Sequence, residues 1–284
     1  MVDNRNIDKK QLEINVNLEL DNIYRWLCVN KLSLNIPKTK FMIFHYRQRN
    51  IDNIIPNLHI NNHQIDRVTD FNFLGITLDE NLSWNKHTQK ISNKISRNIG
   101  CLNRLKNFLP LYTLKLLYNS LIVPHLQYGI LAWGFKFNRV FKLQKRAVRI
   151  ISHNKYNAHS DPIFRDLKLL KIKDIFNLGL LKFQFKLANN SLPSYFSSIF
   201  VQHVTTHRCN TRNRNSVQIP TPRTNSALDT IRHFLPRFIN TMPQLIIDKI
   251  TTHSLKGFCD YAKNYFMNEY SSECHIQNCY ICNR

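Results

Sequence analysis

Residues 139–153 read RVFKLQKRAVRIISH. Apolar residues recur there every three or four positions, which is the spacing of one face of an α-helix: Val140, Leu143, Ala147, Val148 and Ile151. Lys and Arg occupy most of the remaining positions. The pattern predicts a helix with a core-facing side and a cationic side.

The sequence on both sides of this helix favours further helices. The same period predicts helices at 87–105, 111–123, 161–169, 172–188 and 254–270, with Pro110 and Pro124 as breaks. The first 80 residues differ, because a helix at 11–31 precedes expected strands at 41–46, 58–60 and 71–78. Asn61-Asn62 is typical of a tight hairpin turn. We therefore expect an α+β fold that is predominantly α-helical, with one small antiparallel sheet.

Net charge separates the chain into two parts. Lys and Arg number 40 against 18 Asp and Glu, a formal charge of +22 over 284 residues. The first 80 residues hold ten of each sign, so the whole excess lies in the remainder. A basic surface is often only a solvated one, but an excess of this size favours a polyanionic partner.

Composition also excludes some protein classes. Six glycines leave no glycine-rich phosphate loop. The sequence shows no signal peptide and no uninterrupted apolar run long enough for a membrane span. Seven cysteines, most of them scattered, suit a reducing compartment. We expect an intracellular protein, without a distinction between the nucleus and a cytoplasmic ribonucleoprotein.

A set of short motifs resembles one family, the reverse transcriptases of non-LTR (LINE-type) retrotransposons, most closely the jockey group. The similarity covers about residues 10 to 200 and extends more weakly to the end. The motifs are specific as an ordered set: Trp26 to Asn35, Lys38 to Met42, Phe73-Leu74-Gly75, Leu82-Ser83-Trp84 with His87, Leu117-Tyr118 with Pro124, Tyr128-Gly129, Trp133-Gly134 and Gln144 to Arg149.

The resemblance implies roles for residues of the first part. Lys38 corresponds to the lysine of palm motif D, a proton donor near the leaving pyrophosphate, and a lysine supplies both charge and proton there. Phe73, Leu74 and Gly75 correspond to the primer-grip turn of motif E. The alternatives are an exposed turn lysine and a simple β-turn glycine.

The same resemblance shows what the chain lacks. Such polymerases hold two Mg²⁺ ions with palm aspartates, including an adjacent pair. This chain has no Asp-Asp pair, and its only adjacent acids, Asp79-Glu80, are predicted to form a turn. The catalytic palm and fingers are expected upstream. We interpret the chain as a carboxyl-terminal fragment that does not polymerise alone and binds no Mg²⁺ itself.

The family comparison implies three regions: a palm remnant at 1–84, a helical thumb-like domain at 85–200 and a basic extension at 201–284. RNA and DNA template-primer is the implied partner. The best cluster of phosphate contacts is cationic: Arg139, Lys142, Lys145, Arg146 and Arg149. Trp84 and Trp133 are candidates for base stacking, although core positions are the commoner explanation. A stand-alone RNA- or DNA-binding module and the product of a decayed element remain as alternatives.

The terminal residues Cys274, Cys279 and Cys282 have the short spacing of zinc ligands. A fourth ligand is needed, and His275, His253, Cys259 and His233 are the alternatives. The competing interpretation is a set of free reduced thiols.

Overall fold

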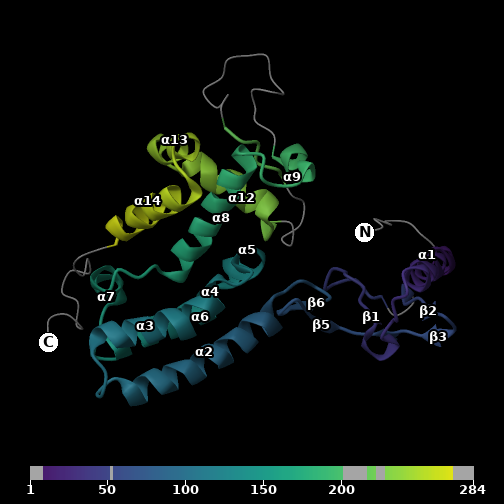
Figure 1. Cartoon of the computed structure of the whole chain (residues 1–284), viewed down its shortest axis with the longest axis horizontal. Helices are drawn as coiled ribbons and strands as arrows, with labels where there is room; N and C mark the ends of the chain where they lie inside the picture. The colour runs from purple at the N-terminus through teal and green to yellow at the C-terminus, as the bar shows by residue number, and fades with distance from the viewer. Residues whose placement is uncertain (1–8, 52–53, 201–215, 222–227, 271–284) are drawn as a thin grey trace, which may run out of the picture. The chain divides into compact units, whose positions relative to one another are not determined.

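The computed structural model describes residues 9–51, 54–200, 216–221 and 228–270 (Figure 1). The chain divides into two compact units, unit 1 at 1–87 and unit 2 at 88–284. Small strand pairs occur in unit 1, and helices dominate the rest. The expected α+β, predominantly helical class is confirmed.

Unit 1 begins with helix α1 (Lys9–Val29), which covers a small core. Leu58, Ile60 and Ile65 are buried, and Val16 and Leu20 of α1 pack against them. Hydrogen bonds fix this contact. The Asn17 side-chain Nδ2 donates to the Asn57 carbonyl at 3.1 Å, and its Oδ1 accepts from the His59 amide at 2.9 Å.

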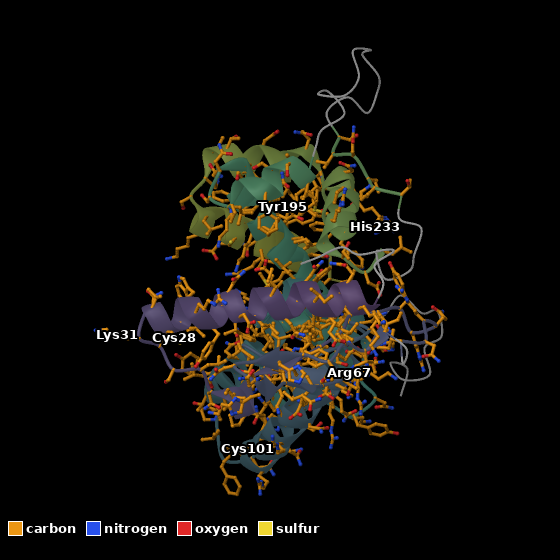
Figure 2. All side chains as sticks on the ribbon, turned by 90° about the vertical axis from the view of Figure 1, so that its right-hand side faces the viewer. Cys28, Lys31, Arg67, Cys101, Tyr195 and His233 are labelled. Carbon is orange, nitrogen blue, oxygen red and sulfur yellow. The ribbon has the colours of Figure 1, made fainter. Side chains whose placement is uncertain are left out.

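The opposite face of α1 is also apolar, and it is exposed. Ile14, Leu18 and Val29 lie there, about 180° around the helix from Val16. Ile23, expected on the core side, is also exposed. Figure 2 shows side chains along the whole of α1 as far as Cys28. Helix α1 therefore packs only one of its two apolar faces against the core of unit 1.

The strands of unit 1 form three separate pairs. Strand β1 (Lys40–Phe41) pairs with β4 (Asp66–Arg67) in parallel, whereas β2 (His59–Ile60) with β3 (His63–Gln64) and β5 (Asp70–Phe73) with β6 (Ile76–Asp79) are antiparallel. The Asn61-Asn62 turn is confirmed, because both residues have positive φ. Our prediction of one small antiparallel sheet is therefore wrong, because the strands form three separate pairs and one pair is parallel.

Two expected strands also differ. The strand over 41–46 is reduced to the two residues of β1, because only they are in register with β4. The strand over 71–78 is a hairpin, since Leu74 and Gly75 take φ values of 47° and 80° and reverse the chain. Asn is not needed for such a turn when glycine holds its second position.

Unit 2 is helical. The long helix α2 starts at the end of unit 1 and continues through unit 2. The helices are α2 (Asn85–Leu105), α3 (Leu111–Leu121), α4 (Val123–Gln127), α5 (Ile130–Trp133), η3 (Gly134–Lys136), α6 (Asn138–Ile151), α7 (Ser160–Asp166), α8 (Ile172–Ala188), α9 (Ser194–Ile199), α12 (Ile231–Thr241), α13 (Gln244–Thr252) and α14 (Leu255–Asn268). The five helices expected at 87–188 and the one at 254–270 are present. Pro124 was expected as a break but lies in the first turn of α4, and Ile122 separates α4 from α3.

A buried amide joins three of these helices. Gln144 of α6 is fully buried, and its Nε2 donates to the Tyr118 hydroxyl of α3 and to the Leu170 carbonyl, both at 2.9 Å. Its Oε1 accepts from the Ile172 amide at the start of α8 at 2.8 Å. All of its hydrogen-bonding groups face protein partners. Gln144 thus sets the relative positions of α3, α6 and α8.

A second polar contact fixes the end of α14 to α8. The Tyr270 hydroxyl donates to Asp174 Oδ2 at 2.6 Å and accepts from the Lys171 amide at 3.0 Å. Lys171 also lies over the Tyr270 ring, 4.0 Å from its centroid, and pairs with Asp161 at 2.7 Å. Burial raises the pKa of Asp174, although the Tyr270 hydrogen bond and Lys171 oppose the shift.

We expect Gln144→Ala to lower the free energy of unfolding by about 2 to 4 kcal/mol, because it leaves three partners unsatisfied, on α3, at the start of α8 and in the segment before α8. Urea unfolding measures the loss. Gln89→Ala is the matched control, since the Gln89 side chain donates to Asn93 on the surface of α2 and its loss should change stability by less than about 0.5 kcal/mol. Equal effects of the two substitutions would contradict this role of Gln144.

Asp174 should give stability a pH dependence of known sign. A carboxyl whose pKa is raised by folding holds its proton more tightly in the native state, so its contribution falls as pH rises from the unfolded value of about 4 through the folded one. Asp174→Asn removes the ionisable group and with it this fall in stability. The stability of the variant relative to the parent should therefore rise as pH increases from about 4 through the folded pKa of Asp174.

Asp260 supplies the opposite control. Its hydrogen bond to Lys263 lowers its pKa, so its contribution is present above about pH 4 and is lost in acid. Asp260→Asn should therefore lose stability relative to the parent as pH rises. Chemical unfolding from below about pH 3 to neutral pH tests both, because the Asp260 change lies below about pH 4 and the Asp174 change lies above it. The same sign for both variants would refute the assignment.

Candidate nucleic-acid interface

Lys38 closes a short 3-10 turn in unit 1, η1 (Ile36–Lys38). The Asn35 side chain caps this turn, because its Oδ1 accepts from the Lys38 amide at 3.2 Å. Lys38 itself is exposed and pairs with no acid among the described residues. Its ammonium is thus free to meet a phosphate, and its motif D role stays a prediction.

Phe73, Leu74 and Gly75 form the tip of the β5–β6 hairpin. The two faces of this hairpin are unusual. Thr77 and Asp79 point inward and are buried, whereas Phe71 and Phe73 on the other face are exposed. The hairpin presents apolar side chains outward, and its primer-grip role stays a prediction. Lys38 and the hairpin tip lie on separate elements of unit 1.

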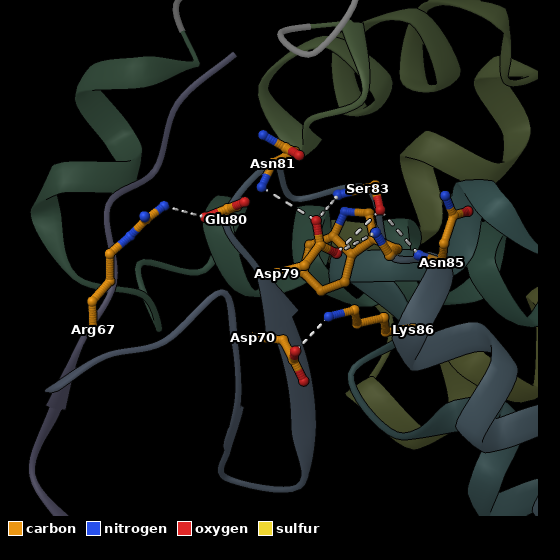
Figure 3. A network of polar contacts seen from close by, with 9 residues as sticks. Arg67, Asp70, Asp79, Glu80, Asn81, Ser83, Asn85 and Lys86 are labelled. Carbon is orange, nitrogen blue, oxygen red and sulfur yellow. Dashed lines mark hydrogen bonds and ion pairs between the residues drawn. The ribbon is translucent and has the colours of Figure 1, made fainter. Parts of the chain in front are cut away.

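Asp79 holds the junction between β6 and α2 (Figure 3). Its carboxylate accepts from the amides of Asn81, Ser83 and Trp84 at 3.2, 2.9 and 3.1 Å. The neighbouring Glu80 pairs with Arg67 at 2.8 Å, and Asp70 pairs with Lys86. The predicted turn at Asp79-Glu80 is confirmed. Both carboxylates are engaged by protein groups, so they do not form a Mg²⁺ site.

Helix α6 carries the predicted cationic cluster, but its members differ in exposure. Arg139, Lys142 and Arg146 are exposed. Lys145 lies over the Phe141 ring, 4.8 Å from its centroid. Arg149 is partly buried, and its Nε donates to the Ala158 carbonyl at 2.7 Å. Three of the five side chains are therefore fully available to phosphates, and Arg149 supports the loop that follows α6.

Helix α2 carries a second cationic stripe that the sequence reading missed. Lys90, Lys94, Arg97 and Arg104 are all exposed. They follow one another at steps of four, three and seven residues, so they share one face of the helix. Ile91, Ile95, Ile99 and Leu102 are buried on the other face. The helical spacing of these Lys and Arg residues could have been found in the sequence together with the spacing of the apolar residues.

The stretch that contains both stripes has no carboxylate. Residues 81–160 include 14 Lys and Arg and not one Asp or Glu. Acids from outside pair with two of these cations, Lys86 and Lys136. A solubilising surface normally mixes both signs. This local composition favours a polyanionic partner more strongly than the net charge of the chain does.

Neither candidate tryptophan is available for stacking. Trp133 is fully buried, and its Nε1 donates to the Tyr128 carbonyl at 2.9 Å. Trp84 is buried within unit 1 and meets the His87 ring edge-on. The core interpretation holds for both.

The three terminal cysteines lie outside the described residues, and zinc binding there stays a prediction. Within the described ranges, no three His, Cys, Asp or Glu side chains come together as a metal site. Cys259, an alternative fourth ligand, is buried, and burial raises the pKa of its thiol. No helix in the described part of the chain is long and apolar enough to cross a membrane.

Comparison with known proteins gives several relatives. The chain is 30% identical over 118 residues to "Probable RNA-directed DNA polymerase from transposon BS" of Drosophila melanogaster, covering 39% of this chain and 13% of that protein. It is 29% identical over 126 residues to "RNA-directed DNA polymerase from mobile element jockey" of the same organism, covering 42% and 14%. The jockey polymerase of Drosophila funebris matches at 26% over 162 residues, covering 55% and 17%.

The chain is a relative of non-LTR retrotransposon RNA-directed DNA polymerases. The resemblance found in its motifs is confirmed. The matched part spans 13 to 17% of the length of these polymerases. No protein-family model matches the chain, and no solved structure matches it significantly.

Arg149 and Lys142 should respond differently to substitution. We expect Arg149→Ala to lower the free energy of unfolding by roughly 1 kcal/mol, because a charged donor to a backbone carbonyl is lost at a partly buried site. Lys142→Ala should cost less than about 0.5 kcal/mol, since its side chain is exposed. Thermal or urea unfolding of both variants decides, and a larger loss for Lys142→Ala would reverse the assignment.

Proposed function

We propose that this chain binds nucleic acid as the basic helical part of a mobile-element RNA-directed DNA polymerase. The observation that carries the proposal is the carboxylate-free stretch with its two exposed cationic stripes. Lys and Arg on one face of a helix contact backbone phosphates and read no sequence. The polymerase names of the relatives support a template-primer of RNA and DNA as the partner.

The proposal assigns residues 1–84 to the end of a palm domain, 85–200 to a thumb-like domain and 201–284 to a basic extension. In this arrangement Lys38 would donate a proton to the leaving pyrophosphate, and Phe73 to Gly75 would contact the primer end. Polymerisation itself needs Mg²⁺ and paired aspartates. The residues present do not fit that site, so this chain supplies binding and not the metal-dependent chemistry. An intracellular location follows from such a substrate.

A second candidate function is a stand-alone RNA- or DNA-binding module. It is favoured by the fact that unit 2 has its own buried core around Gln144. Both candidates require binding without sequence preference. They differ in whether a catalytic partner is needed, which reconstitution of primer extension with a palm-containing polypeptide would reveal.

The salt dependence of binding tests the shared step. Each duplex phosphate contact contributes about −0.9 to the slope of log K against log salt. We expect Lys142→Ala with Arg146→Ala to flatten the slope by about 1.8, and Lys90→Ala, Lys94→Ala and Arg97→Ala together to flatten it by about 2.7. Fluorescence anisotropy with an RNA–DNA duplex measures both, and unrelated duplex sequences should weaken alike.

Lys173→Ala with Lys256→Ala is the matched control, because it removes two exposed cations outside the carboxylate-free stretch. Its slope should stay close to that of the parent. A control variant that flattens the slope as much as the α6 variant would mean that binding follows net charge alone and that α2 and α6 form no defined interface.

A further inference from the structure

The corner between α2 and α3 exposes a group of large apolar side chains. The corner cluster consists of Phe108, Leu111, Tyr112 and Leu116, which are 82, 49, 78 and 56% exposed. Such side chains normally occupy a core, and a contiguous exposed group of them marks an interaction site. The cluster follows α2 along the chain and extends into α3. Cys101, near the end of α2, is labelled in Figure 2.

The fold of unit 2 does not need these side chains. Helix α3 buries Leu114 and Tyr118 on its core face, and both are almost fully enclosed. Tyr112 and Leu116 are four residues apart on the opposite face of α3. Phe108 lies in the turn between α2 and α3. Polar residues at these positions would leave the core unchanged. The cluster is therefore a surface feature with a use outside the unit's own packing.

The charge around the cluster identifies the chemistry of its partner. Arg104, Lys106 and Lys115 flank it, and none forms an ion pair with a described residue. The nearest acids in the sequence lie before residue 81 and after residue 160. A partner must therefore offer both flat apolar surfaces and negative charge. Unpaired bases with their phosphates offer both, whereas a duplex hides the faces of its bases.

We propose that the corner cluster is a stacking platform for unpaired bases of single-stranded nucleic acid. Tyr112 and Phe108 stack on base faces, Leu111 and Leu116 contact sugars, and Arg104, Lys106 and Lys115 neutralise phosphates. The site is separate from the cationic stripe of α6, which meets phosphates alone. It rests on the proposed function and extends it from backbone contact with a duplex to recognition of the strand state of the nucleic acid.

The test compares two probes on the full chain. One is a single-stranded oligonucleotide of about twelve nucleotides that contains 2-aminopurine, within the size range of such sites. The other is a closed duplex without free ends. Tyr112→Ala with Phe108→Ala should bind the single strand about 5- to 100-fold more weakly per aromatic lost, and the closed duplex as the parent does.

Two further variants separate stacking from other causes. Tyr112→Phe keeps the ring and should keep both the affinity and the 2-aminopurine quenching. Tyr195→Ala removes another exposed tyrosine, labelled in Figure 2, that lies outside the carboxylate-free stretch, and should change neither. Because all the substituted side chains are exposed, the circular dichroism spectra and melting temperatures of the variants should match those of the parent.

The outcomes separate this inference from the proposed function. An equal loss on both probes, or no loss on the single strand, overturns the stacking platform while duplex binding through α6 stands. Failure of the parent to bind either probe overturns both. A concentration-dependent dimer in sedimentation that Tyr112→Ala abolishes would instead assign the cluster to a contact between two copies of the chain, and would also refute the proposal.

Discussion

The side chain of Gln144 is the constraint on which the helical unit depends. A buried primary amide must satisfy every donor and acceptor or cost stability, and this one does so only if α3, α6 and the start of α8 hold their observed places. The geometry that satisfies Gln144 also turns the opposite face of α6 outward. The exposed cations of α6 are thus positioned by a hydrogen-bond network on the helix's buried side.

The strand pairs of unit 1 are short and need support from neighbouring elements. Two-stranded pairs are marginal alone, and here they rely on one face of α1 and on the Asp79 carboxylate at the start of α2. The β5–β6 hairpin buries its polar residues because Asp79 is needed at that junction. Its aromatic residues are left on the outer face as a result. The hydrogen bonds of Asp79 to the backbone before α2 thus determine which face of the hairpin is exposed.

Much of this arrangement could be read from the sequence. Helix α8 begins and ends where its apolar spacing predicts, and the turn at Asn61-Asn62 follows from the tolerance of Asn for positive φ. The helices α12 and α13 were not predicted, because Pro236 lies inside α12 and Pro243 directly precedes α13. The parallel pairing of β1 with β4 depends on contacts between distant segments, which local propensity does not encode.

The candidate interface was likewise predicted only in part. The cations of α6 were found because they alternate with a clear apolar stripe, whereas the structural part played by Arg149 depends on where the loop at Ala158 returns. Gln144 did leave a signal, since a polar residue in the middle of an apolar face indicates a buried hydrogen-bond network.

The absence of acids between residues 81 and 160 makes this surface a permanent cation. Elsewhere, carboxylates that lose their charge in acid change the net charge of a protein surface. Here Lys and Arg carry the charge, and burial together with Lys94 lowers the pKa of His125. The field around α2 and α6 therefore keeps its sign and nearly its strength from mildly acidic to mildly alkaline solution. Ionic strength, and not pH, is the variable that controls the reach of this part of the protein.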